Sequence, residues 1–190
     1  DARKQHGAPV PLAGGLAIFG AILLGSQFRD VWPFTDVPLG LFTLVFLLGV
    51  IDDRVHLDPR LRLGLPYAIG LAIAAWGSLT IYNVRNLLAL GDLPLLFMSI
   101  PLTALSFAGL ANAYNMVDGI DGLAGCLIAV PLATLLWLGL QQGSALVPLL
   151  EITLIATAVY LVFNLGPNRT WLPRIFLGDT GSVTLGFLVC

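Results

Sequence analysis

The stretch NAYNMVDGIDG, residues 112–122, places polar side chains at three-residue intervals directly after a run of apolar residues. These side chains are Asn112, Asn115, Asp118 and Asp121. Neighbouring pairs share a helix face, although the series drifts about 60° per step around an ideal helix. Two glycines permit a break here, which would let the two aspartates converge on one ligand. The structural alternative is Asp121 as the N-cap of the next helix.

Two further acidic motifs have residue types and a spacing that suit phosphate chemistry. Asp52 and Asp53 follow the apolar run VFLLGVI, and adjacent helical positions point about 100° apart. One carboxylate would then face a metal and the other an acceptor phosphate, unless the pair is simply interfacial charge. Asp179 lies in FLGDTGS, where small residues at a helix start expose N–H groups that can hold phosphate. Asp179 would carry the bridging metal, or else serve as a helix N-cap.

Carboxylates gathered in one place need a counter-charge. Two unit charges 4 Å apart interact by about 4 kcal/mol at an effective dielectric of 20, and a cation or a shared proton relieves that repulsion. No histidine or cysteine cluster accompanies the aspartates. Oxygen ligands alone favour Mg²⁺, with Mn²⁺ as the alternative, over zinc. The sequence therefore predicts a divalent cation bound by aspartates.

The elements that position these motifs are predicted to be membrane-spanning helices. Hydrophobic residues make up 57% and charged residues 11% of the 190 positions, whereas soluble domains carry roughly 25% charged residues. About 20 apolar residues cross a bilayer. The predicted fold is an all-α polytopic transmembrane helical bundle, a single integral-membrane domain over residues 1–190. Its candidate spans are about 11–28, 37–51, 64–82, 94–113, 122–140 and 144–163, with a seventh beginning near 182.

The distribution of basic residues orients this bundle. Successive spans alternate in direction, so the connecting segments fall on alternate faces. One face receives seven of the nine basic residues, namely Arg3, Lys4, Arg54, Arg60, Arg62, Arg169 and Arg174. The positive-inside rule makes that face cytoplasmic, and every acidic motif above also falls on it. The net charge of −2 gives no argument for a nucleic-acid partner.

Basic and aromatic side chains on the motif face are candidates for ligand contacts. Arg3, Lys4, His6 and Arg54 are candidates for binding anionic lipid or phosphate, although arginines and lysines at such positions often serve only as topology signals. Phe176 is a candidate for stacking on a flat base. The alternative for Phe176 is ordinary packing before a turn.

Taken together, the motifs resemble those of the polyprenyl-phosphate N-acetylhexosamine-1-phosphate transferases of glycosyltransferase family 4. The resemblance covers nearly the whole chain, through RKQHGAPVPLAGG, GVIDDR, NAYNMVDGIDGLAG, FNLGPN and RIFLGDTGS. The motif NMVDGIDG resembles that of the bacterial undecaprenyl-phosphate GlcNAc-1-phosphate transferases more closely than that of the phospho-MurNAc-pentapeptide translocases. Members of the family also carry a further hydrophobic segment before this region and a His-x-His-His motif after it. The chain is thus expected to be a fragment of a larger bundle, truncated at both ends.

The resemblance implies an enzyme that transfers N-acetylhexosamine-1-phosphate from a UDP-sugar to undecaprenyl phosphate in the bacterial inner membrane. Its site would face the cytoplasm, and a homodimer is a candidate assembly. The implied site residues fall into three groups. The Mg²⁺ would be bound by Asp179 and Asp53. The catalytic group would be Asp52, Asp53, Asp118 and Asp121. The nucleotide and diphosphate would be contacted by Asn115, Asp118, Asp121, Phe176 and Gly178.

Two other classes compete with this interpretation. An ion-coupled transporter also places aspartates in membrane helices, but near the centres of its spans, whereas these aspartates gather at one face. An inactive fragment is the second alternative, because the later His-rich motif would lie beyond Cys190.

Overall fold

The computed structural model describes residues 10–28, 36–76, 79–85, 92–166 and 173–190, with the side chains of 36–39 left aside. Within these ranges the chain is helical, with one short 3-10 helix, η1 (Leu96–Met98). The α-helices are α1 (Gly14–Phe28), α2 (Asp36–Val55), α3 (Pro59–Ala75), α4 (Ser99–Val117), α5 (Leu123–Gln142), α6 (Val147–Leu165) and α7 (Gly178–Leu188). The prediction of an all-α bundle is confirmed.

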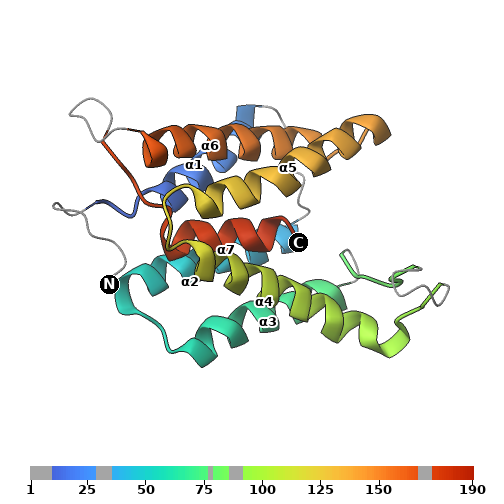
Figure 1. Cartoon of the computed structure of the whole chain (residues 1–190). Coiled ribbons are helices and arrows are strands. Elements are labelled where there is room, and N and C mark those ends of the chain that lie inside the picture. Colours follow the sequence, from blue (N-terminus) through green and yellow to red (C-terminus); the bar gives the residue numbers. More distant parts are fainter. Residues whose placement is uncertain (1–9, 29–35, 77–78, 86–91, 167–172) are drawn as a thin grey trace.

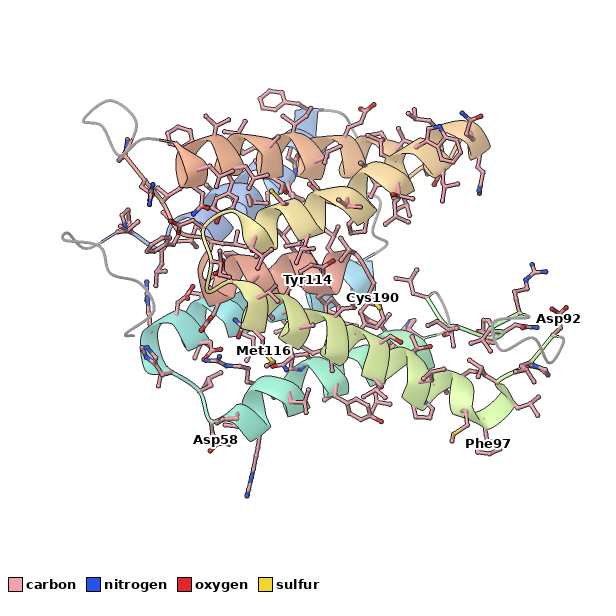
Figure 2. The ribbon with its side chains drawn as sticks, in the orientation of Figure 1. Asp58, Asp92, Phe97, Tyr114, Met116 and Cys190 are labelled. Carbon is pink, nitrogen blue, oxygen red and sulfur yellow. The ribbon has the colours of Figure 1, made fainter. Side chains whose placement is uncertain are left out.

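The helices form a bundle whose motif-bearing ends lie together. The carboxyl ends of α2, α4 and α6 and the amino ends of α3, α5 and α7 meet at the left of Figure 1. Asp58, in the turn before α3, lies at this end, whereas Asp92 and Phe97 lie at the opposite end (Figure 2). The alternation of spans along the sequence therefore predicted correctly that the motifs gather at one end.

The number of membrane spans is a separate matter from the number of helices. Among the described residues, three helical segments are long and apolar enough to cross a membrane: Leu96–Val117, Leu123–Gln142 and Val147–Leu165. The helix α1 is apolar but shorter. The helices overlap the predicted spans, although α3 and α7 begin earlier in the sequence than predicted, and a membrane helical bundle fits them. The predicted count of about six spans is not confirmed.

Local chemistry explains where α2 and α3 differ from the hydropathy pattern. The helix α2 continues past residue 51 through Asp52 and Asp53 to Val55, because both carboxylates find hydrogen-bond partners. The helix α3 begins at Pro59, earlier than predicted, because the Asp58 side chain accepts from the Arg60 N–H at 2.8 Å and Pro59 occupies the first turn. An N-cap aspartate followed by proline is a strong start signal.

The helix α7 lies at the centre of the bundle, against α1, α2 and α4. Small residues allow these close contacts, as is common where helices pack in membranes. A Cβ atom added at Gly15 would lie 2.2 Å from the Gly181 backbone nitrogen, and one added at Gly49 would lie 2.5 Å from the Thr180 Cα. The position of α7 thus depends on glycines of α1 and α2.

This packing predicts a strong effect of a single methyl group on α1. Gly15→Ala should lower the free energy of unfolding by about 1–3 kcal/mol, because α1 and α7 must move apart. Gly20→Ala is the matched control on the same helix, since a Cβ there meets nothing within 4 Å and alanine is the better helix former. Thermal unfolding of the two purified variants in detergent tests the difference. Equal melting temperatures would contradict the close contact.

Candidate active site

The Arg62 side chain lies at the centre of the polar cluster at the motif end. Its guanidinium contacts the Asp52 carboxylate, with Nε 2.7 Å from Oδ2 and an NH2 group donating to Oδ1 at 2.8 Å. It also donates to the Asn115 Oδ1 at 3.0 Å and to the Asp179 Oδ2 at 3.3 Å. One cation therefore joins three motifs that lie on α2, α4 and α7.

Asp52 is the most enclosed carboxylate of the cluster, with 2% of its surface exposed. Besides Arg62, it accepts a hydrogen bond from the backbone N–H of Leu57 at 2.8 Å. A buried carboxylate is stable only when it is paired and hydrogen-bonded. Asp52 is thus placed to hold the turn between α2 and α3 and to orient the guanidinium.

Asp179 is half-buried and faces the same cluster. Its Oδ1 accepts from the Asn115 Nδ2 at 2.6 Å, and the same amide also donates to the Ser182 hydroxyl at 3.1 Å. Burial raises the pKa of the Asp179 carboxyl. The Asn115 hydrogen bond and the Arg62 guanidinium act in the opposite direction and lower that pKa. Burial, together with the neighbouring Asp52 and Asp53 carboxylates, outweighs these two partners, so the pKa of Asp179 stays above its usual value.

Asp53 provides the anionic cap of α7. Its Oδ1 accepts from the Asp179 N–H at 2.7 Å, and its Oδ2 accepts from the N–H and the hydroxyl of Thr180. A carboxylate at a helix N-terminus satisfies free N–H groups and complements the helix dipole. Asp179 is therefore not the N-cap of its own helix. The cap comes from α2, and the metal role of Asp53 stays a prediction.

Gly178 makes this capping geometry possible. Its φ of 74° lies in the left-handed region, and a Cβ there would lie 2.9 Å from the Asp53 Oδ2. In this structure the anion at the start of α7 is Asp53. The role of Gly178 in binding a diphosphate stays a prediction.

The 112–122 stretch breaks as its glycines predicted. The helix α4 ends at Val117 with Asp118 as its C-cap, and α5 begins after Gly122, whose φ is 75°. Asp121 is not the N-cap of α5, since Gly122 occupies that position, and its Oδ2 pairs with Arg174 at 2.9 Å. The break therefore separates Asn115, which joins the Arg62 cluster, from Asp121, which joins Arg174.

The remaining candidate residues are placed as follows. Phe176 is 7% exposed, so its ring is packed within the bundle. Arg54 lies exposed in the last turn of α2. Arg3, Lys4 and His6 lie outside the described residues. Ligand contacts by these side chains stay predictions.

Sequence reasoning counted Arg62 among the basic residues of one face and gave it no role in the site. The sequence did contain a signal for the position of Arg62, because this residue lies one turn after the helix start marked by Asp58 and Pro59. The short turn between α2 and α3 returns this position to the level of Asp52. The sequence has three arginines in that region, at positions 54, 60 and 62, and only the fold shows which of them joins the site.

The donor set suits a magnesium ion only in part. Among the described residues, no group of three His, Cys, Asp or Glu side chains is arranged to hold a metal ion. Mg²⁺ is commonly bound by one or two carboxylates together with substrate phosphates. Asp179, with 28% of its side chain exposed, fits that mode of binding, whereas an all-protein metal cage does not fit.

The sequence similarity of the chain to known proteins shows its family. The model of the family described as "Glycosyl transferase family 4" matches residues 37–190. The chain belongs to glycosyl transferase family 4. The matched region contains Asp52, Asp53, Arg62, Asn115 and Asp179, so the whole Arg62 cluster lies within the stretch that the family model matches.

Curated relatives of this family 4 chain carry closely similar names. A protein of Bacillus subtilis (strain 168), called probable undecaprenyl-phosphate N-acetylglucosaminyl 1-phosphate transferase, is 31% identical over 98% of this chain and 51% of its own length. Proteins of Escherichia coli (strain K12) and Thermotoga maritima, called undecaprenyl-phosphate alpha-N-acetylglucosaminyl 1-phosphate transferase, are 30% and 32% identical over 98% of this chain. The family 4 chain spans about half the length of these relatives.

Proposed function

We propose that the protein transfers an N-acetylhexosamine-1-phosphate group from a UDP-sugar to undecaprenyl phosphate. The observation that carries this proposal is the cluster in which Arg62 joins Asp52, Asn115 and Asp179 at one end of an apolar bundle. The names of the family 4 relatives support undecaprenyl phosphate as the acceptor. The products would be the undecaprenyl diphosphate sugar and UMP.

The residues of the cluster suit attack of one phosphate on another. An oxygen of the acceptor phosphate would bond to the sugar-linked phosphorus, and the bond from that phosphorus to the UMP oxygen would break. Both reactants are anions, so catalysis depends on positioning and on charge stabilisation. Arg62 can supply positive charge in the orientation that Asp52 fixes, because a guanidinium holds phosphate in a defined geometry.

A magnesium ion fits beside Asp179 in this proposal. When bound, the ion supplies charge neutralisation for the diphosphate. Asp179 would hold it, and the Asn115 amide keeps that carboxylate oriented at 2.6 Å. Asp53 supports the same carboxylate indirectly, since it caps the first turn of α7 through the N–H of Asp179.

The proposed setting is the bacterial inner membrane, with the cluster facing the cytoplasm. The excess of basic residues at the motif end favours this orientation. A site at the membrane face lets a lipid acceptor approach from the bilayer while a soluble nucleotide arrives from the cytosol. The reaction would be the first membrane-bound step in the synthesis of a cell-envelope glycan.

The decisive assay follows UMP release by the full-length protein in vesicles that contain undecaprenyl phosphate. UDP-GlcNAc, UDP-GalNAc and UDP-glucose are supplied in turn, with Mg²⁺, with Mn²⁺ and with EDTA. We expect UMP only with an N-acetylhexosamine donor, acceptor lipid and a divalent cation together. Release of no UMP under any of these conditions would refute the transferase, and would be the result for an ion-coupled transporter.

A further inference from the structure

The Asn164 side chain bridges two segments of the candidate site from the end of α6. It is 1% exposed. Its Oδ1 accepts from the backbone N–H of Gly122, and its Nδ2 donates to the backbone oxygen of Ile175 at 2.8 Å. One partner can only donate and the other can only accept, so the orientation of the amide is fixed by chemistry.

Each of the two bridged segments carries acidic candidates of the site. Gly122 closes the break that contains Asp118 and Asp121, and it adopts a left-handed φ of 75° before α5. Ile175 begins the segment that leads to Asp179 at the start of α7. These segments lie side by side at the motif end, next to the carboxyl end of α6 (Figure 1).

The Ile175–Leu177 segment is held from its other side by the start of α1. The Phe176 N–H donates to the Pro11 oxygen at 3.0 Å. The N–H groups of Gly14 and Gly15 donate to the oxygens of Phe176 and Leu177, each at 2.9 Å. The backbone before α7 is therefore fixed between α1 and Asn164, and the Asn164 amide sets its distance from Gly122.

A second bridge between the same segments is weaker. Arg174 pairs with Asp121 at 2.9 Å, with side-chain exposures of 24% and 32%. Partly exposed ion pairs hold geometry less firmly than a fully buried, doubly hydrogen-bonded amide, because water and salt screen them. Asn164 is thus the more rigid of the two connections.

We propose that Asn164 is a positioning residue, which fixes the 118–122 break relative to Asp179 and so sets the spacing of the two halves of the site. This inference rests on the proposed function, because turnover is its functional readout. Displacement of a catalytic group by about 1 Å can cost about 100-fold in rate. Loss of both hydrogen bonds of Asn164 should therefore lower kcat by about 10- to 100-fold.

The experiment compares three variants of the full-length protein. Asn164→Ala removes both hydrogen bonds, whereas Asn164→Asp keeps the acceptor for Gly122 and loses the donor for Ile175. Thr157→Val is the matched control, because Thr157 is also fully buried on α6 but donates within its own helix, to the Thr153 oxygen at 2.8 Å. The measurements are kcat per folded molecule, KM for the UDP-sugar, melting temperature, and hydrogen–deuterium exchange of peptides over 118–124 and 175–180.

We expect faster exchange in both peptides of Asn164→Ala, with the loss in kcat larger than the rise in KM. The Asp variant should fall between Ala and wild type, and Thr157→Val should match wild type in exchange and in kcat. A purely structural Asn164 would lower the melting temperature and leave kcat per folded molecule unchanged, which would overturn the inference. Unchanged exchange in both peptides would overturn it too.

The exchange measurement separates this inference from the proposed function. If wild-type protein releases no UMP, the transferase proposal fails. The exchange data then still decide whether Asn164 holds the two segments together. Normal turnover in Asn164→Ala, beside an active wild type, would overturn the positioning role alone.

Discussion

Asp179→Asn is expected to abolish cation-dependent UMP release, with a loss of at least about 100-fold in kcat. Asparagine keeps the size of the side chain, and so the first turn of α7 should persist. It removes the negative charge that would hold the ion. Its NH₂ group would also face an N–H donor of Arg62, which in the wild type lies 3.3 Å from the Asp179 Oδ2. The measurement is UMP release by the full-length protein in vesicles, at saturating UDP-sugar.

A neighbouring carboxylate supplies the control for this variant. Asp58 lies exposed at the same end of the bundle and caps α3, and asparagine is an equally good N-cap. Asp58→Asn should therefore keep turnover within about twofold of wild type. Wild-type turnover in Asp179→Asn, with normal membrane insertion of both variants, would remove Asp179 from the proposed cation site.

The second large effect is expected at Arg62. Arg62→Met leaves the Asp52 carboxylate buried without its guanidinium, and breaking a buried ion pair from one side costs about 3–5 kcal/mol. Arg62→Lys keeps the charge but lacks the planar group that now reaches Asp52, Asn115 and Asp179 together. We expect Met to lower the melting temperature strongly, and Lys to lose turnover with a smaller loss of stability. Thermal unfolding in detergent and UMP release measure the two effects.

A double variant separates stability from catalysis at this site. Asp52→Asn combined with Arg62→Met removes both charges, so the melting temperature should recover part of the loss while turnover does not return. Arg60→Met is the control, since Arg60 is exposed on the same turn of α3. If Arg62→Met and Arg60→Met unfold at the same temperature, the buried pair contributes nothing to stability.

Much of the architecture could be predicted from local properties of the sequence. Runs of apolar residues marked each helix, and alternation of spans brought the acidic motifs to one end of the bundle. The break after Val117 was predicted from glycines, because Gly122 needs the left-handed backbone that it adopts. These features depend on composition and backbone preference within a few residues, which the sequence states directly.

Pairings between helices could not be predicted in this way. The sequence assigned the cap of α7 to Asp179 or to a phosphate, yet the cap is Asp53 from α2, 126 positions away. The sequence has three arginines near the start of α3, and the sequence analysis gave Arg62 no role in the site. It gave no role to Asn164, whose partners lie on two other segments.

The physical reason is that membrane helices carry apolar residues on all faces. In a soluble bundle, the polar side of each helix shows which face points inward. Here the apolar pattern fixes where each helix lies along the chain and leaves its rotation open. The rotation is decided by close contacts such as Gly15 against Gly181. The sequence alone thus determined which end of the bundle holds the charged groups, and the tertiary structure decided which of them meet.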